Sequence, residues 1–481
     1  MRSAATLAAA VTFGIVAQLL FFAHPAGLNV TVATVLFLVL LWLVRRRTAH
    51  RDPIDLWMPG AALLFAGFSA VRADLPLVVA DGLAALGLCA ASGATFAGLR
   101  LTRLPASELI VAGLRTTGSL LASAATLLRP ATAAIVPMIG GRAAAYLVGV
   151  VLAAPLVVIF AFLFSSADAI FAKALEDAAA IVSPALIREL PGRIALGCVG
   201  AWLAGGAFAG IRPSTAGAPR IQPRLAAEPA LAMLATIVAL FAGFVVLQLA
   251  YLFGGLDTLQ ASGLQFSAYA RRGFIELIAV TALVGLLLFT IELQLRVRRL
   301  AHLRLELALL GLTAVVLASA WYRLDLYQRA YGWTELRVYA LAGIAFCGIA
   351  LMILGWCIAN RGMRHALQPV AIAVVVVGLV LNAIGPTALV ARADIARVTG
   401  ATELPADAER TLDACYLVSL GDGAIPALVA LLPTIPKPDH DRLEMCLRRE
   451  AARRVSDPAP WQSWNSDHAA ARDALQRLIG R

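Results

Sequence analysis

The chain has 481 residues, of which 60% are hydrophobic and only 14% are charged. A soluble domain carries about 25% charged residues, so this composition indicates a protein that lies in a lipid bilayer. The net charge of +11 does not indicate a nucleic-acid partner, because most arginines lie in short segments at the ends of apolar runs and no basic face with interleaved aromatic residues occurs outside them.

Apolar runs that approach or exceed the width of a bilayer recur through the first 384 residues. A helix needs about 20 residues to cross ~30 Å of hydrocarbon, and it satisfies its own backbone hydrogen bonds there. The sequence therefore predicts an all-α fold, a polytopic transmembrane helix bundle. Its spans, about eleven of them, are predicted at residues 5–22, 28–44, 56–71, 75–99, 143–164, 194–211, 230–253, 274–293, 305–322, 338–356 and 366–384.

Two domains are predicted, a transmembrane helical domain at 1–384 and a small soluble helical tail domain at 385–481. The first holds four N-terminal spans (1–99) and seven later spans (143–384). Between them, the segment 107–141 is apolar but interrupted by arginines, threonines and a proline. We expect an amphipathic helix on the inner leaflet here. If this segment crossed the membrane, the predicted orientation of every later span and of the tail would be reversed.

The distribution of basic residues predicts the orientation. With the N-terminus in the cytoplasm, the inside segments hold 19 arginines, and the outside segments before the tail hold nine lysines and arginines. Cytoplasmic loops are usually the more basic ones. We therefore predict a multipass protein of a bacterial cytoplasmic (inner) membrane, with a cytoplasmic N-terminus and an extracytoplasmic tail.

The tail becomes polar and contains short amphipathic runs. Helices are predicted at 412–420 and 424–432, as a helical hairpin, and at 439–455 and about 466–478, with Ser466 as the N-cap of the last.

Two cysteines, Cys415 and Cys446, fall in this tail. In an oxidising compartment they could form a disulfide. Two separately buried thiols are the alternative, since sequence does not report the distance between them.

Two polar clusters adjoin predicted spans on the outside face. In SSADAIF, Asp168 either accepts a proton or cation at the membrane edge or simply caps a short helix. In SAYARRGFIEL, Arg272 and Glu276 lie four residues apart and can pair on one helical face. Alternatively, Arg272 binds an anion, and Tyr269 lines that site as a hydrogen-bonding residue.

The third cluster, WYRLDLYQRAYGWTELRVY at 321–339, is a polar and aromatic island between two apolar runs. We expect the preceding helix to continue to Tyr331 and end at Gly332, with the next helix beginning at Thr334 and Glu335. In such a helix Asp325 and Arg329 lie four residues apart, as do Tyr327 and Tyr331. Interfacial anchoring explains the aromatic residues but not the balanced set of charges. The candidates for ligand binding or partner docking are Tyr327, Arg329, Tyr331, Glu335 and Arg337.

One further ionisable residue, Asp81, lies inside the fourth predicted span without a sequence neighbour to pair with. It is the best intramembrane functional candidate, although partial exposure near the outer edge would also explain it. No nucleotide-binding, zinc-protease or nucleophile motif occurs, and the six histidines are scattered. We therefore expect no metal, no cofactor and no catalytic residue.

The three polar blocks resemble a known family. LFSSADAIF, SAYARRGFIEL and LYQRAYGWTELRVYA, together with PTALVARADIAR and LDACYLVSL in the tail, are similar to recurrent blocks of a bacterial multipass membrane family, domain of unknown function 4173, which is related to the 4153 group. The resemblance covers about 143–432. The chain departs from it at Ala169, where a proline is expected, and at 385–387, where Asn-Pro-Asp is expected. The resemblance implies the architecture but no reaction.

Three functions fit these observations. The first is a non-enzymatic envelope sensor or scaffold whose outside clusters dock its own tail or a periplasmic protein partner. The second is a proton- or cation-coupled secondary transporter that uses Asp81 or Glu276. The third is a membrane enzyme that acts on lipid-linked substrates. The sequence does not predict the oligomeric state.

Overall fold

The computed structural model describes ten segments of the chain: 2–45, 53–105, 108–109, 185–209, 227–253, 274–295, 297–360, 362–400, 412–454 and 460–480. Its elements in these segments are helices, as the sequence predicts. The predicted span at 143–164 lies outside these segments, and so does the surface segment at 107–141 except for two residues.

Every predicted span that falls in the described residues coincides with a helix. The helices are α1 (Arg2–Phe21), α2 (Leu28–Arg45), α3 (Trp57–Ser69), α4 (Leu75–Phe96), α8 (Ala185–Ala209), α9 (Ala227–Phe253), α12 (Phe274–Gln294), α13 (Leu300–Tyr331), α14 (Glu335–Ala359) and α15 (Leu367–Ile384). Six of them (α1, α2, α4, α13, α14 and α15) contain a stretch long and apolar enough to cross a membrane, and α3 and the apolar parts of α8, α9 and α12 are shorter. The total of eleven spans stays a prediction.

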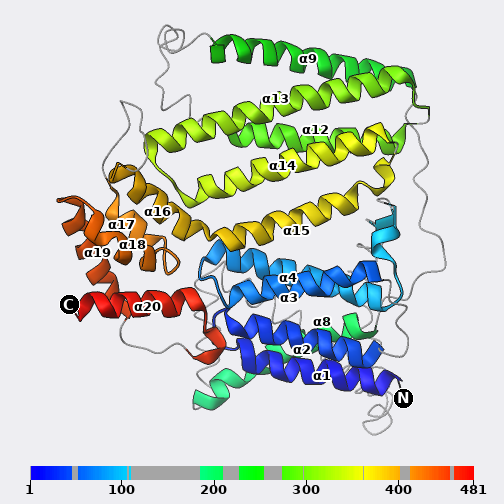
Figure 1. Cartoon of the computed structure of the whole chain (residues 1–481). Helices are drawn as coiled ribbons and strands as arrows, with labels where there is room; N and C mark the ends of the chain where they lie inside the picture. The colour runs from blue at the N-terminus through cyan, green and yellow to red at the C-terminus, as the bar shows by residue number, and fades with distance from the viewer. Residues whose placement is uncertain are drawn as a thin grey trace, which may run out of the picture.

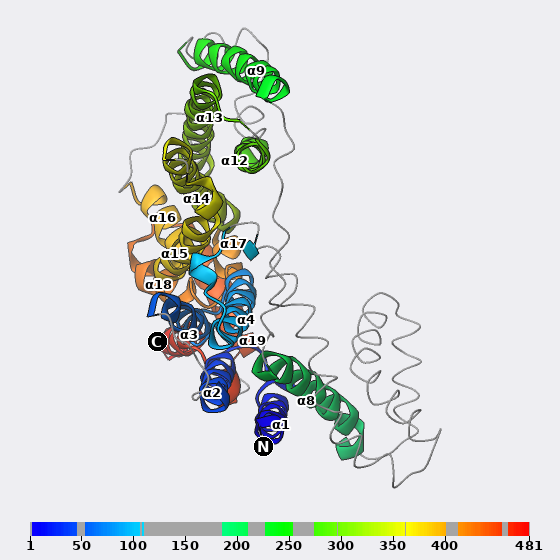
Figure 2. The same ribbon diagram turned by 90° about the vertical axis from the view of Figure 1, so that its right-hand side faces the viewer.

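These helices lie side by side in one extended array (Figure 1). Seen end-on, they form a curved row that runs from α9 through α13, α14 and α15 to α4, α2 and α1 (Figure 2). The row has separate apolar cores, one among α9, α12, α13 and α14 and another among α1, α2, α4 and α8. Large apolar side chains such as Val79, Leu83 and Leu86 remain exposed on the outside of the row. Such a surface suits lipid rather than water.

Close backbone contact joins α1 to α8. A side chain on Gly14 would collide with the Gly197 carbonyl oxygen and would place its Cβ 2.6 Å from the Ala201 Cβ. Small residues at such contacts let membrane helices approach closely.

The tail consists of α16 (Pro386–Val398), α17 (Ala414–Ser419), α18 (Ile425–Leu431), α19 (Asp439–Arg454) and α20 (Ser466–Ile479). All four predicted tail helices are found. The predicted N-cap of the last one is wrong by one residue, because the Asn465 side chain, not that of Ser466, accepts the hydrogen bond from the His468 N–H.

The tail helices gather at one end of the array, and the N-terminus lies at the other (Figure 1). Their apolar core includes Ile425, Leu428 and Leu443, which are fully buried. Val338 of α14 and Val390 of α16 belong to the same core. The packing is therefore continuous from the tail into the end of a membrane helix.

Candidate functional site

The polar island forms the turn between α13 and α14. As predicted, α13 ends at Tyr331 and α14 begins at Glu335. Gly332 has a φ of +80°, in the region that favours glycine. The Trp333 N–H donates a 2.7 Å hydrogen bond to Asp394 Oδ1 of α16. A Cβ on Gly332 would lie 2.7 Å from that same oxygen, so only glycine lets the turn sit this close to α16.

Side chains spaced four residues apart in the island meet as the sequence predicts. Arg329 forms a 2.9 Å ion pair with Asp325, and the Tyr327 and Tyr331 rings lie 4.9 Å apart. The Arg337 guanidinium lies 4.1 Å from the centre of the Tyr327 ring and donates to the Gly332 carbonyl. Arg337 therefore fixes the turn through a cation–π contact and a backbone hydrogen bond. Arg329, with 61% of its side chain exposed, makes no such link.

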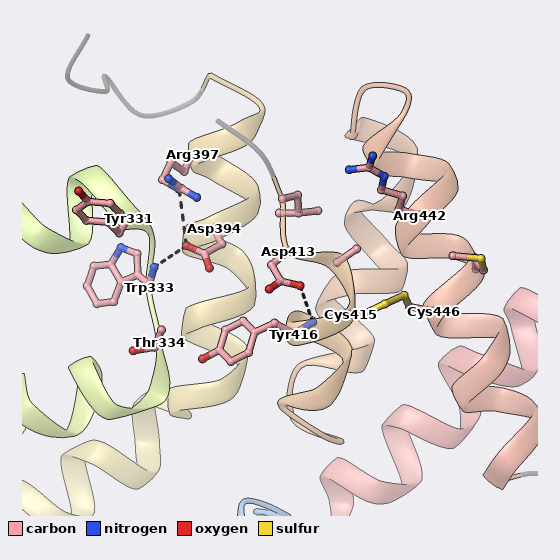
Figure 3. Close-up of a pocket in the computed structure, with 13 residues that line it drawn as sticks. Tyr331, Trp333, Thr334, Asp394, Arg397, Asp413, Cys415, Tyr416, Arg442 and Cys446 are labelled. Atoms are coloured by element: carbon pink, nitrogen blue, oxygen red, sulfur yellow. Dashed lines mark hydrogen bonds and ion pairs between the residues drawn. A yellow bond between two sulfur atoms is a disulfide. The ribbon is translucent and has the colours of Figure 1, made fainter. Parts of the chain in front are cut away.

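A cavity of about 790 Å³ lies between this turn and the tail (Figure 3). One wall of this cavity holds Asp394 and Arg397 of α16, both buried and 3.9 Å apart. Burial raises the pKa of Asp394 to about 6, although the Trp333 N–H and the two nearby arginines partly oppose this. The lining residues are Tyr331, Trp333, Thr334, Asp394, Arg397, Leu412, Asp413, Ala414, Cys415, Tyr416, Arg442, Met445 and Cys446.

The opposite wall of the cavity belongs to α17 and α19. The Asp413 side chain caps α17 by accepting from the Tyr416 N–H at 3.0 Å. Cys415 and Cys446 form a disulfide that joins the two helices (Figure 3), which is the paired alternative of the two that the sequence left open. The Tyr416 hydroxyl is hydrogen-bonded to the Glu335 backbone, so this wall is tied directly to the start of α14.

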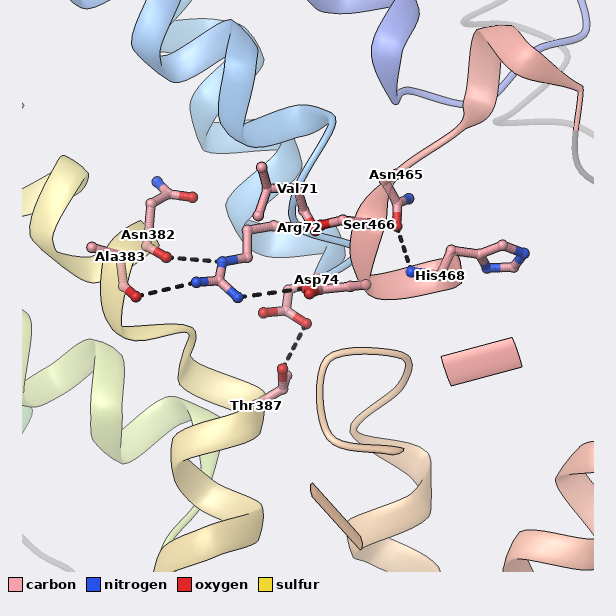
Figure 4. A network of polar contacts seen from close by, with 10 residues as sticks. Val71, Arg72, Asp74, Asn382, Ala383, Thr387, Asn465, Ser466 and His468 are labelled. Carbon is pink, nitrogen blue, oxygen red and sulfur yellow. Dashed lines mark hydrogen bonds and ion pairs between the residues drawn. The ribbon is translucent and has the colours of Figure 1, made fainter. Parts of the chain in front are cut away.

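A second contact between the tail and the membrane helices surrounds Arg72, in the turn between α3 and α4 (Figure 4). Its Nε donates to the Asn382 carbonyl at 2.8 Å, and its Nη2 donates to the Ala383 carbonyl at 3.2 Å. Its Nη1 lies 3.7 Å from Asp467 Oδ2 of α20. One guanidinium therefore joins the end of α15 to the first turn of the last tail helix.

Backbone and hydroxyl groups extend this contact. The Ser466 N–H donates to the Ala70 carbonyl at 2.9 Å, and the Asp467 N–H donates to the Val71 carbonyl at 3.1 Å. The Thr387 hydroxyl donates to Asp74 Oδ1 at 2.9 Å.

We refer to the contacts among Arg72, Asp74, Asn382, Thr387 and Asp467 as the junction (Figure 4). A Cβ on Gly423, in the loop before α18, would collide with the Thr387 hydroxyl, so this loop packs tightly against the junction.

Asp81 is not partly exposed, and that interpretation is wrong. Only 1% of the residue is accessible, and its Oδ1 accepts a 2.7 Å hydrogen bond from the Asn382 side chain of α15. The partner lies 301 residues away, which is why no neighbour in the sequence indicated it.

The remaining predicted site residues are not described by the structure. Asp168, Tyr269 and Arg272 lie outside the described residues, and Glu276 lies in α12 with an undescribed side chain. Within the described residues, no group of three or more His, Cys, Asp or Glu side chains could hold a metal ion.

Sequence reasoning missed Arg72, Asp74, Asp394 and Asp467. The sequence indicated Arg72 and Asp74 only as a short charged turn between two apolar runs, and Asp394 and Asp467 only as acidic residues of the tail.

A family profile described as Domain of unknown function (DUF4153) matches residues 59–431. The chain belongs to the DUF4153 family. The match extends the predicted resemblance towards the N-terminus and supports the 4153 group; it does not support the 4173 label. No curated protein and no solved structure matches the chain. The family and the apolar helices together indicate a DUF4153 membrane protein of unknown function.

Replacing Gly332 by alanine tests the turn of this DUF4153 protein. We expect Gly332→Ala to lower the free energy of unfolding by roughly 1–3 kcal/mol, because a side chain is strained at this φ and meets Asp394. Thermal unfolding of the purified protein measures this. Gly343→Ala, in the interior of α14 with open space around its Cβ, is the matched control and should be neutral or slightly stabilising, because alanine favours a helix more than glycine does. Equal unfolding temperatures for the two variants would contradict this account of the turn.

Proposed function

We propose that the protein is a non-enzymatic scaffold or sensor of a bacterial inner membrane that presents its own tail at the extracytoplasmic surface to a periplasmic protein partner. The observation that carries this proposal is that the tail is attached at two separate places. One is the turn at Trp333, held by Asp394, and the other is the junction around Arg72, which contacts Asp467.

The polar groups of the cavity support a structural role. Asp394 accepts the Trp333 N–H, and Asp413 caps α17. The Arg337 guanidinium is held by Tyr327 and the Gly332 carbonyl. Groups that position backbone and helix ends suit a scaffold better than a site of bond cleavage.

The proposed orientation is supported by charge and by the disulfide. Among the described residues, the end of α2 at Arg45 and the start of α13 after Arg299 lie on the side of the N-terminus, and the tail lies at the opposite end of the array (Figure 1). The bond between Cys415 and Cys446 suits an oxidising compartment.

A proton- or cation-coupled transporter is the second candidate, and the burial of Asp81 favours it. An acidic side chain buried between α4 and α15 beside an amide is typical of an ion or proton pathway.

Loss of the Arg72 side chain tests docking of the tail. We expect Arg72→Gln to speed proteolytic cleavage within the tail in membrane vesicles by roughly tenfold or more, because charged hydrogen bonds to Asn382 and Ala383 and the ion pair with Asp467 are lost. Arg337→Glu should also speed cleavage. Arg329→Gln is the matched control, since its exposed pair lies outside both attachments. Unchanged cleavage in the Arg72 and Arg337 variants would refute docking.

Labelling of the tail cysteines tests the orientation. In intact cells, Cys415 and Cys446 should resist alkylation until a reductant is added and should then react with a membrane-impermeant maleimide. Variants that keep Cys415 and Cys446 but replace the other four cysteines with alanine make the readout specific. Labelling only after lysis would place the tail in the cytoplasm and contradict the proposal.

Uptake measurements separate the scaffold from the transporter. If the transporter is correct, Asp81→Asn removes the titratable group and abolishes proton-coupled uptake of a solute by proteoliposomes. Absence of uptake for every solute offered to the wild-type protein, amino acids, sugars and inorganic ions included, supports the scaffold.

A further inference from the structure

The junction and Asp81, which is bonded to the Asn382 side chain, together contain more acidic than basic groups. Three carboxyl groups, those of Asp74, Asp81 and Asp467, surround the Arg72 guanidinium. Only 5% of Asp74 and 1% of Asp81 are accessible. One guanidinium balances one carboxylate, and an ionised carboxylate that is buried without compensation is costly. Protonation of one carboxyl group reduces the excess charge.

Two of these carboxyl groups, those of Asp74 and Asp81, have a buried oxygen that faces neither a hydrogen-bond donor nor Arg72, and of these two Asp74 is the one bonded to a tail helix, α16. Asp467 faces Arg72 and accepts the Ala73 N–H. Asp81 accepts the Asn382 amide through Oδ1 and has a buried Oδ2 without a hydrogen-bond partner, but it lies inside α4 and its bond is to α15. Asp74 accepts the Thr387 hydroxyl through Oδ1, whereas its Oδ2 is buried and has no hydrogen-bond partner. A proton on this second oxygen removes the charge without breaking the bond to Thr387.

We propose that Asp74 is a proton-binding site and that the proton bound there strengthens docking of the tail. This proposal rests on the proposed function and extends it. The signal to which the docked tail responds is then the acidity outside the membrane. Asp74 lies in the turn before α4 and faces α16 through Thr387 and α20 through Asp467, so its charge acts directly between the tail and the membrane helices.

The direction of the pH effect follows from the pKa of Asp74. Burial raises this pKa from 3.8 to about 6, against the opposing hydrogen bond from Thr387, and the nearby carboxylates of Asp467 and Glu335 raise it further. The docked state therefore binds the proton more tightly than an undocked, hydrated Asp74. The added stability is fully present below about pH 4 and is lost as the pH rises through about 6.

Other titratable groups face this region and define the controls. Glu335 and Tyr339 face it from α14, and Asp467 faces it from α20. His468 of α20 lies 2.7 Å from Asp422 through its Nδ1, so its protonation also strengthens a tail contact in acid. A His468→Gln variant removes this second contribution.

Hydrogen exchange of backbone amides in the full-length protein, held in lipid nanodiscs, tests this proposal. The Ser466 and Asp467 amides report docking, because they donate to the Ala70 and Val71 carbonyls. Their protection factors, corrected for intrinsic exchange, should be roughly three- to tenfold higher at about pH 5 than at about pH 7.5. Asp74→Asn, neutral and of the same shape, should be highly protected at both pH values. The His468→Gln variant should keep most of the response.

A matched control and a second variant test the role of the site. Asp55 is equally buried and accepts the Thr102 hydroxyl at 2.6 Å, but it lies at the other end of these helices, so Asp55→Asn should keep the full response. Thr387→Val removes the hydrogen bond that lowers the pKa of Asp74. The midpoint of the response should therefore move to higher pH in this variant.

The outcomes separate this proposal from the proposed function. Equal protection of wild-type Ser466 and Asp467 at both pH values, or an unchanged response in Asp74→Asn, overturns the proton site while docking stands. An unmoved midpoint in Thr387→Val also counts against it. Wild-type amides that are unprotected at both pH values overturn docking itself, and with it both proposals.

Discussion

The attachment of the tail to the membrane helices depends most on the Arg72 guanidinium, which donates hydrogen bonds to the last carbonyl groups of α15. These carbonyls have no partner within the helix and carry its negative partial charge, so a cation is stabilised there. Because the same guanidinium faces Asp467, it fixes the α3–α4 turn, α15 and α20 relative to one another. Gly385, with a φ of +69°, permits this, since a Cβ there would lie 2.7 Å from Arg72 Nη1.

Asn382 connects this surface contact to the membrane interior. Its backbone carbonyl accepts from Arg72, while its side chain donates to Asp81 inside α4. A buried acid of a membrane helix and the attachment of the tail therefore share one residue. Any change that moves the end of α15 alters both contacts. The two candidate functions, tail docking through Arg72 and transport through Asp81, therefore depend on the same residue of α15.

Local patterns in the sequence predicted what depends on neighbouring residues. The apolar runs gave the helices, Gly332 gave the end of α13, and the four-residue spacing gave the Asp325–Arg329 pair. Spacing alone could not predict contacts between distant segments. Asp81 finds Asn382 301 residues later, and Arg72 finds Asp467 across nearly the whole chain. Charge in an apolar run showed that Asp81 needed a partner, but it did not show which one.

At the other end of the helix array, the buried charged groups come from neighbouring parts of the sequence. There Arg298 lies 3.1 Å from Glu292 and 3.3 Å from the fully buried Glu306, and these groups come from α12, α13 and the loop between them. A proton gained or lost at Glu306 acts on helices that are already joined by a short connection. At the junction, Asp74 and Asp467 come from opposite ends of the sequence. A change of charge between them therefore acts on segments that no short connection joins, which is why the proposed proton at Asp74 would affect how firmly the tail is docked.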